Sequence, residues 1–276
     1  MDLQLLESLL NDVASFLWGY PLIILLFGTH IYLTIRLRFI QRYIFKAIKI
    51  SFGRGKEGKG DISQFGALTT ALAATIGTGN IVGVATALTV GGPGAIFWMW
   101  LSGVFGIATK YAEALLSVKY RVTNPDGTVS GGPMYVLERG LKMKWLGVVF
   151  AALTAISAFG IGNMTQANSI AHLAEDTFAV APWLTGIIIT LLTAVVILGG
   201  IKSIAKVTEA LVPFMALFYI VGGIIVLMLQ PGSILDTISL IINSAFTGHA
   251  ALGGFAGAGI KEAMRFGIAR GLFSNE

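Results

Sequence analysis

Apolar residues occur in long runs along this chain, and the charged residues lie between those runs. One run extends from Val13 to Ile35, between Asp12 and Arg36. About 20 apolar residues are enough to cross the hydrocarbon core of a bilayer as an α-helix, whereas membrane β-strands show shorter alternating patterns. The pattern therefore predicts transmembrane helices. Further spans are predicted at residues 145–173, 183–200 and 210–229, with a more charged apolar segment from about residue 253 to the end.

The uncharged run from residue 62 to residue 109 is too long for a single crossing. Gly91-Gly92-Pro93-Gly94 lies near its middle. Glycine and proline together favour a turn and interrupt helices. This run is therefore predicted to form two spans joined by a tight connection.

The composition supports an integral membrane protein. Apolar residues make up 55% of the chain and charged residues 12%, against roughly 25% charged residues in soluble domains. The mean hydropathy is +0.80. The absence of Cys from the sequence excludes disulfides, thiolate catalysis and Cys-ligated metals within it. The acidic start of the chain does not resemble a signal peptide, which would begin with basic residues.

The charged residues indicate an orientation in the membrane. If the segment after the first span is cytoplasmic, the alternation of spans places every Lys and Arg before Lys261 on that face. Cytoplasmic loops are enriched in Lys and Arg, so the N-terminus is predicted to lie outside. The net charge of +5 is thus explained by membrane orientation and does not indicate a nucleic-acid partner. The acidic residues of the outer face are Asp2, Glu7, Asp12, Glu175, Asp176 and Asp236.

The span from Ile62 to Val90 contains poor helix-forming sequence at its centre, where Ala74 to Gly83 reads ATIGTGNIVG. An unwound stretch there is tolerated in hydrocarbon if its main-chain groups face a cavity lined by protein. Its N–H groups would then receive a carboxylate and its carbonyls a cation. Alternatively, Gly79 and Gly83 allow close helix packing. The residues alone leave both interpretations open, while the GxGxxxG spacing excludes a dinucleotide-binding loop.

A second polar cluster lies in the span from 145 to 173. Asn163 and Gln166 are three residues apart and are expected to share a helix face. Such amides either bond neighbouring helices or line a solute site, and both interpretations stay open. His30 is expected to be a hydrogen-bonded core residue rather than a proton relay. Since the sequence contains no paired catalytic groups or metal-ligand spacing, it does not indicate an enzyme.

Three separated segments resemble the alanine or glycine:cation symporter family of the amino acid–polyamine–cation superfamily. They are Ala74–Gly83, the run Gly131-Gly132-Pro133-Met134-Tyr135, and the terminal run from Arg270 to Glu276. The similarity extends over essentially the whole chain. The resemblance implies an all-α integral membrane protein of the leucine-transporter type, with two inverted five-helix repeats. It also implies a transporter of the cell membrane that imports alanine or glycine with Na⁺ by alternating access.

The resemblance divides the chain as follows. Residues 1–36 would be an extra N-terminal transmembrane helix and residues 37–61 a cytoplasmic loop. Residues 62–229 would form the first repeat, whose first helix is discontinuous. Residues 230–276 would hold an outer loop and the discontinuous first helix of the second repeat. The chain is therefore expected to represent part of a longer transporter, and no oligomeric state follows from the residues.

The resemblance also implies a substrate site for a small neutral amino acid. Its carboxylate would meet the N–H groups of Thr78, Gly79 and Asn80, and its ammonium the carbonyls near Thr75 and near the break at Phe273 and Ser274. Gln166 and Asn163 would form a polar wall, and Phe273 would limit the size of the side chain. The predicted substrate-binding residues are Thr75, Thr78, Gly79, Asn80, Asn163, Gln166, Phe273, Ser274, Asn275 and Glu276.

Na⁺ is implied as the coupling ion, held by the main-chain carbonyls of Ala73 and Ile76. Oxygen ligands suit such a hard cation. Two alternatives of the same fold stay open, namely a proton-coupled amino acid transporter and a channel. A channel would need a continuous polar stripe, whereas this sequence concentrates its polar residues in one central cluster.

Overall fold

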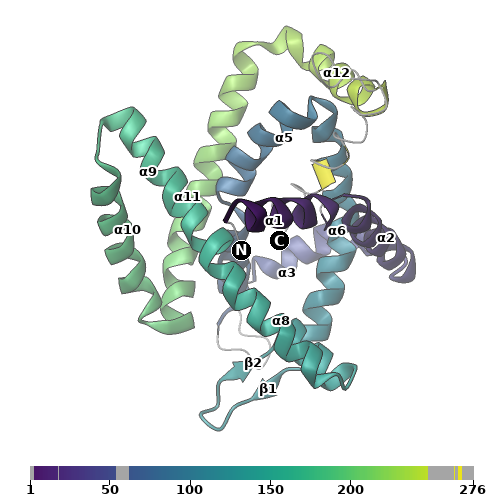
Figure 1. Cartoon of the computed structure of the whole chain (residues 1–276), viewed down its shortest axis with the longest axis vertical. Helices are drawn as coiled ribbons and strands as arrows, with labels where there is room; N and C mark the ends of the chain where they lie inside the picture. Colours follow the sequence, from purple (N-terminus) through teal and green to yellow (C-terminus); the bar gives the residue numbers. More distant parts are fainter. Residues whose placement is uncertain (1–2, 18, 54–61, 248–263, 265–266, 269–276) are drawn as a thin grey trace. The chain divides into compact units, whose positions relative to one another are not determined.

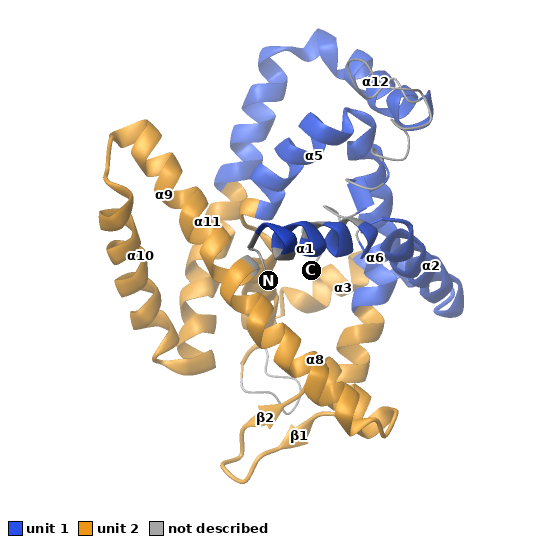
Figure 2. Ribbon diagram, viewed as in Figure 1, with its two compact units in different colours: residues 1–44, 79–110, 218–276 blue, residues 45–78, 111–217 orange. Residues whose placement is uncertain are grey.

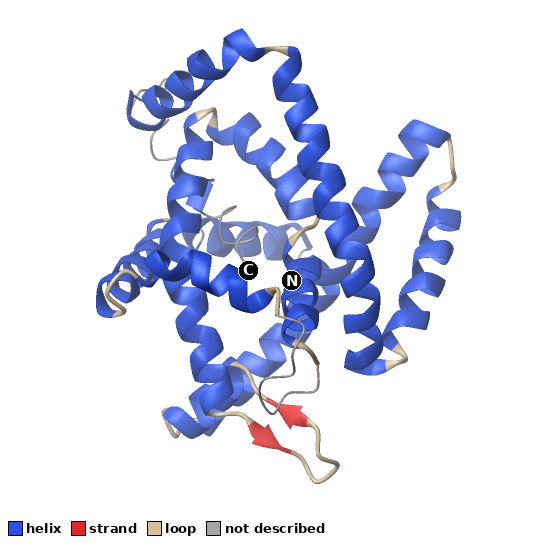
Figure 3. Cartoon of the chain, turned by 180° about the vertical axis from the view of Figure 1, so that it is seen from behind, coloured by secondary structure: helices blue, strands red, loops and turns tan. Residues whose placement is uncertain are grey.

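The computed structural model describes residues 3–17, 19–53, 62–247, 264 and 267–268, and these are mostly helical (Figures 1 and 3). The labels η1 and η5 denote 3₁₀ helices, and η2, η3 and η4 denote π-helical segments. In chain order the helical elements are α1 (Leu3–Leu17), α2 (Tyr20–Arg36), η1 (Ile40–Tyr43), α3 (Ile44–Ser51), α4 (Gln64–Thr75), η2 (Gly79–Gly83), α5 (Val84–Gly91), α6 (Gly94–Lys119), α7 (Pro133–Tyr135), η3 (Val136–Gly140), α8 (Lys144–Ser157), η4 (Ala158–Met164), α9 (Thr165–Phe178), α10 (Pro182–Ile197), α11 (Gly200–Leu229), η5 (Pro231–Ser233) and α12 (Ile234–Thr247).

The chain folds into two compact units, each built from separated segments (Figure 2). Unit 1 contains residues 1–44, 79–110 and 218–276, and unit 2 contains residues 45–78 and 111–217. The long helices α6 and α11 each contribute residues to both units.

Helices suited to a bilayer are present, as the apolar runs predict. Lys144–Phe178 and Gly200–Leu229 are each long and apolar enough to cross a membrane. Two interrupted pairs pass the same test if each is counted as one span, namely Tyr20–Arg36 with Ile40–Ser51 and Gln64–Thr75 with Gly79–Gly91. Large apolar side chains such as Leu229, which is 75% exposed, cover these helices. Such surfaces suit lipid contact, because lipid tails are as apolar as the side chains themselves.

The helix boundaries differ from the sequence prediction in three places. The expected first span, Val13 to Ile35, is divided at Gly19, and α2 begins at Tyr20 with a proline in its first turn. Proline suits that position because its missing N–H would have no helical partner there. The expected cytoplasmic loop at 37–61 contains η1 and α3, and the expected outer loop after residue 230 contains η5 and α12. These short helices escaped prediction because their polar residues interrupt the apolar runs.

Unit 1 is held together around α6. The connection expected at Gly91–Gly94 is present, and Gly92 adopts a positive φ of 70°. Aromatic rings from α2, α6 and α12 pack edge to face, including the Phe27–Phe105 and Trp98–Phe246 pairs. His30 on α2 is buried and its Nδ1 lies 2.7 Å from Thr109 Oγ1, so it is a hydrogen-bonded core residue as expected.

Unit 2 contains the segment α8–η4–α9, α10, most of α11 and a small hairpin. The hairpin pairs β1 (Val122–Thr123) with β2 (Val129–Ser130) in antiparallel register. Its turn contains Asp126, whose carboxylate accepts hydrogen bonds from the hydroxyl and the N–H of Thr128. These bonds lower the pKa of Asp126 because they favour its charged form.

Candidate functional site

The helix that begins with α4 is interrupted at the predicted place. α4 ends at Thr75, and Ile76 has an extended backbone with φ −79° and ψ 99°. The Ile76 N–H still donates to the Leu72 carbonyl at 2.7 Å, which completes the last turn. A π-helical segment, η2, then begins at Gly79. Gly83 in this segment is buried, so close packing of a small residue accompanies the break instead of replacing it.

Thr78 and Gln166 are brought together at the interruption, although they are 88 residues apart in the chain. Gln166 Oε1 accepts a hydrogen bond from the Thr78 N–H at 3.2 Å and another from the Thr78 hydroxyl at 2.5 Å. In an uninterrupted helix the Thr78 N–H would donate to the Ala74 carbonyl, four residues earlier. The side chain of Gln166 therefore replaces the helical partner of this N–H group.

These two bonds also determine which way the Gln166 amide points. A backbone N–H can only donate, so the atom that it contacts must be the amide oxygen. The assignment of oxygen and nitrogen in Gln166 therefore follows from the contact itself. The NH₂ group of Gln166 then has two hydrogens to donate. Gln166 thus presents an acceptor to Thr78 and carries donors beside it.

Gly77 contributes to the same contact, and the role assignments from sequence did not include it. A Cβ atom at Gly77 would lie 3.4 Å from Gln166 Oε1 and 3.6 Å from its nitrogen. These are ordinary contact distances, so Gly77 lies directly against the Gln166 amide. The Gly77-Thr78-Gly79 pattern marks this segment in the sequence. Only the fold shows that Gly77 lies against the Gln166 amide.

The main-chain oxygens at the end of α4 suit a cation. The Leu72 carbonyl accepts the last helical hydrogen bond, from the Ile76 N–H, before the chain becomes extended. The next carbonyl is that of Ala73, predicted as a Na⁺ ligand, and the Thr75 hydroxyl donates to the Ala71 carbonyl at 2.9 Å. Among the described residues, no three His, Asp or Glu side chains lie close enough together to hold a metal ion. Carbonyl oxygens such as that of Ala73 are of the kind that hard cations accept as ligands.

The structure connects the remaining predicted site residues less closely with the contact between Thr78 and Gln166. Asn80 lies in η2, and its Oδ1 atom is buried with no hydrogen-bond partner among the described residues. Asn163 lies in η4 and is exposed, and the contacts of the structure bring Gln166, not Asn163, to Thr78. The predicted site residues Phe273, Ser274, Asn275 and Glu276 lie outside the described residues.

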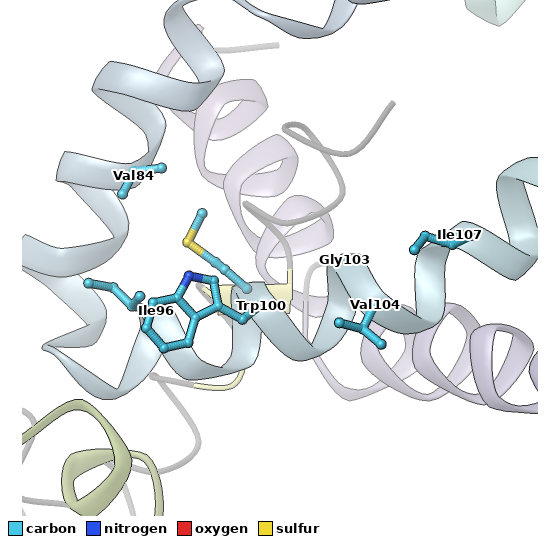
Figure 4. A pocket seen from close by; sticks show the side chains of 7 residues that line it. Val84, Ile96, Trp100, Gly103, Val104 and Ile107 are labelled. Atoms are coloured by element: carbon cyan, nitrogen blue, oxygen red, sulfur yellow. The ribbon is translucent and has the colours of Figure 1, made fainter. Parts of the chain in front are cut away.

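A cavity of about 520 Å³ lies in unit 1, beside the aromatic ring of Trp100 (Figure 4). Its lining is apolar, with side chains from α5 and α6. A zwitterionic solute needs hydrogen-bond partners for both of its charges, and this lining offers aliphatic and aromatic groups instead. The cavity therefore does not suit such a solute. The lining residues are Val84, Ile96, Met99, Trp100, Gly103, Val104 and Ile107.

Comparisons with known proteins give a consistent identification. The family model described as "Sodium:alanine symporter family" matches residues 3–276. The sodium/alanine symporter AgcS of Methanococcus maripaludis is 51% identical over 276 residues, which cover 98% of this chain and 60% of that protein. Two Bacillus subtilis proteins are also similar. The amino-acid carrier protein AlsT is 37% identical, over 98% of this chain and 57% of its own length.

The second Bacillus subtilis protein, named probable sodium/glutamine symporter GlnT, is 36% identical over 99% of this chain and 56% of its own length. The chain therefore spans a little more than half the length of these relatives. Their names describe transporters rather than enzymes. A match over nearly all of the residues, together with a helix broken at the predicted segment, leads to one conclusion: the chain belongs to the sodium:alanine symporter family.

Proposed function

We propose that the protein containing this chain imports a small neutral amino acid, alanine or glycine, together with Na⁺. The observation that carries the proposal is the double hydrogen bond from Thr78 to the Gln166 oxygen. An N–H and an O–H that converge on one oxygen are the donors that a carboxylate oxygen requires. The names of AgcS and AlsT support an amino acid as the cargo.

In this proposal the substrate carboxylate takes over the donors of Thr78 from the Gln166 oxygen. The N–H groups of Gly79 and Asn80 follow directly in the chain and add further donors. The NH₂ group of Gln166 donates to the second carboxylate oxygen. The substrate ammonium needs acceptors, and the carbonyl near Thr75 and the buried Asn80 Oδ1 are of that kind. Phe273 and Ser274 would complete the site, and Phe273 would select small side chains.

Na⁺ binds in this scheme at the carbonyls of Ala73 and Ile76. The cation and the carboxylate then share the same unwound segment, so ordering by either ligand favours binding of the other. Such coupling is reciprocal by thermodynamic necessity. The membrane potential contributes about 2.3 kcal/mol per charge and per 100 mV to inward movement of the cation. Na⁺ is thus a transported ligand that drives accumulation of the amino acid.

We further propose the architecture that such transport needs. The chain would hold an extra N-terminal helix, the first of two inverted repeats and the start of the second, in a leucine-transporter-type fold. Alternating access would occur by rocking of one helix bundle against the other around the site. The protein would reside in the cell membrane with its N-terminus outside.

The test is uptake of radiolabelled alanine and glycine into proteoliposomes that contain the complete transporter. Inward gradients of Na⁺, H⁺ and K⁺ are imposed separately. We expect saturable uptake that depends on the Na⁺ gradient and is lost in Gln166→Leu. Asn168→Leu, an exposed amide on the same helix, is the matched control and should transport normally. Saturable uptake without any cation dependence would overturn symport, and uptake driven only by the H⁺ gradient would replace Na⁺ by protons.

A further inference from the structure

The N-terminal end of α4 is attached to α11 through a serine and a carboxylate within unit 2. Ser63 caps α4, because its Oγ accepts a hydrogen bond from the Gly66 N–H at 2.9 Å. The same Ser63 hydroxyl donates to Glu209 Oε1 at 2.8 Å. Glu209 lies on α11, 146 residues further along the chain. One side chain therefore both begins the broken helix and connects it to a neighbouring helix.

Gly66 allows the carboxylate to reach the first turn of α4. A Cβ atom at this position would lie 2.5 Å from Glu209 Oε1, a distance that real Cβ atoms essentially never show. Glycine leaves room for the carboxylate in its observed place, whereas a larger residue would shift the end of the Glu209 side chain. The first turn of a helix also favours a negative charge, because its N–H groups form the positive end of the helix dipole. The close approach of Glu209 is thus sterically permitted and electrostatically favourable.

Small and hydroxyl-bearing residues make up the rest of this contact. Gly66 and Thr69 are the buried residues of α4. Thr69 Oγ1 lies 3.4 Å from Thr208 Oγ1, and Thr70 Oγ1 lies 3.3 Å from the same atom. Such a stripe permits close approach of two helices but buries little apolar surface. The hydrogen-bond contacts described between α4 and α11 are thus hydroxyl to hydroxyl, and at the first turn a hydroxyl to the Glu209 carboxylate.

A displacement at the first turn of α4 is passed to its other end. The helix has 12 residues, which at 1.5 Å per residue gives a length of about 18 Å. Its last turn carries the Ala73 carbonyl and leads into the break at Ile76. The hydrogen bonds within a helix make it stiffer than the extended residue that follows α4 at Ile76. Tilting its N-terminus therefore moves the carbonyls at its C-terminus.

From these contacts we propose that Glu209 is a positioning residue for the broken helix. Through Ser63, its carboxylate holds α4 on α11 and thereby sets the place of the α4 carbonyls at the break. Glu209 contacts neither ligand itself. The proposal rests on the proposed function only for its effect on Na⁺. Its structural part, the position of α4 on α11, is independent of what the protein transports.

The structural part is measured by electron paramagnetic resonance on the complete transporter. Nitroxide labels on Ala67→Cys in α4 and Lys206→Cys in α11 use two exposed positions. We expect Glu209→Leu to broaden and shift the distance distribution between the labels. Glu209→Gln keeps an oxygen acceptor for Ser63 and should retain the original distribution. Glu175→Leu, which removes an exposed carboxylate from α9, is the matched control.

The functional part is measured by Na⁺-dependent uptake in proteoliposomes. Glu209→Leu should raise the Na⁺ concentration for half-maximal uptake about tenfold and change the maximal rate by less than about threefold. Glu209→Gln should restore the original Na⁺ dependence. If Glu209→Leu does not accumulate in the membrane, Ser63→Ala with rescue by Ser63→Thr makes the same comparison. A general loss of folding would lower the maximal rate without this pattern of rescue.

The outcomes separate the two proposals. An unchanged distance distribution in Glu209→Leu would overturn the positioning role, whatever the transport result. The positioning role would also be overturned if Glu209→Leu transports normally and its Na⁺ concentration for half-maximal uptake is unchanged. If the unmodified protein shows no cation-dependent uptake, the proposed function fails, and the distance measurement still decides whether Glu209 positions α4.

Discussion

At the residue scale, the candidate site depends on one side chain that takes the place of a helical hydrogen bond. The Gln166 oxygen accepts from both donors of Thr78, where an intact helix would use the Ala74 carbonyl. This contact stabilises an interruption that would otherwise leave a main-chain donor unpaired in the membrane. It also identifies the N–H and the hydroxyl of Thr78 as donors at the break that are directed at an oxygen atom.

Removal of the Thr78 hydroxyl tests this site directly. Thr78→Val keeps the shape of the side chain and the N–H donor but loses the O–H donor. A hydrogen bond contributes about 0.5–1.5 kcal/mol, so we expect the KM for the amino acid to rise by about twofold to tenfold. Thr78→Ser retains the hydroxyl and should stay close to the original KM. Equal KM values for the valine and serine variants would show that this hydroxyl does not bind substrate.

At the scale of elements, α6 and α12 approach so closely within unit 1 that only glycine fits at Gly94. A Cβ atom there would lie 2.7 Å from main-chain atoms of both Ser244 and Ala245. At Gly106, further along the same helix, a Cβ atom would lie 3.7 Å from His30 Nε2, an ordinary contact distance. Gly94 and Gly106 therefore differ in their tolerance of an added methyl group.

This difference predicts opposite outcomes for two alanine substitutions. Gly94→Ala should lower the thermal unfolding midpoint of the purified protein in detergent, because overpacking against backbone typically costs about 1–3 kcal/mol. Gly106→Ala should leave the midpoint unchanged or raise it, since alanine favours helix by about 0.5–1 kcal/mol over glycine. A midpoint for Gly94→Ala equal to that of Gly106→Ala would contradict the close contact of α6 with α12.

At the scale of the whole molecule, the distribution of charge predicts how the chain crosses the membrane. With every Lys and Arg before Lys261 on one side of the predicted spans, the N-terminus should face outward. The 276 residues contain no Cys, so single cysteines can report the side on which each loop lies.

Labelling with a membrane-impermeant maleimide in intact cells tests this orientation. Ser8→Cys and Asp176→Cys should react without permeabilisation. Lys49→Cys and Thr128→Cys should react only after the membrane is opened. The complete transporter without an added cysteine gives the background. Labelling of Lys49→Cys in intact cells would reverse the predicted topology.

The membrane helices and the break could be predicted from sequence because both depend on local properties. Charge-free length indicates spans, and the glycines and threonines around Ile76 are poor helix formers. The sequence did not predict the division at Gly19 and missed α3 and α12, because a short amphipathic helix does not produce a long apolar run. Through the resemblance to a family, Gln166 was expected to line a substrate site, which stays a prediction, and its hydrogen bonds with Thr78 were not foreseen.

The sequence by itself determined that the chain is helical and apolar enough for a bilayer, and it indicated poor helix-forming residues near Ile76, because these properties depend on neighbouring residues. The structure decided between close packing and a break there, and it shows the break. Only the tertiary structure decided which distant groups meet. It brought Gln166 to Thr78 over 88 positions and Glu209 to Ser63 over 146, and it left Asn163 exposed. The physical reason is that side-chain partners depend on helix packing, and packing joins residues whose separation in the chain carries no local signal.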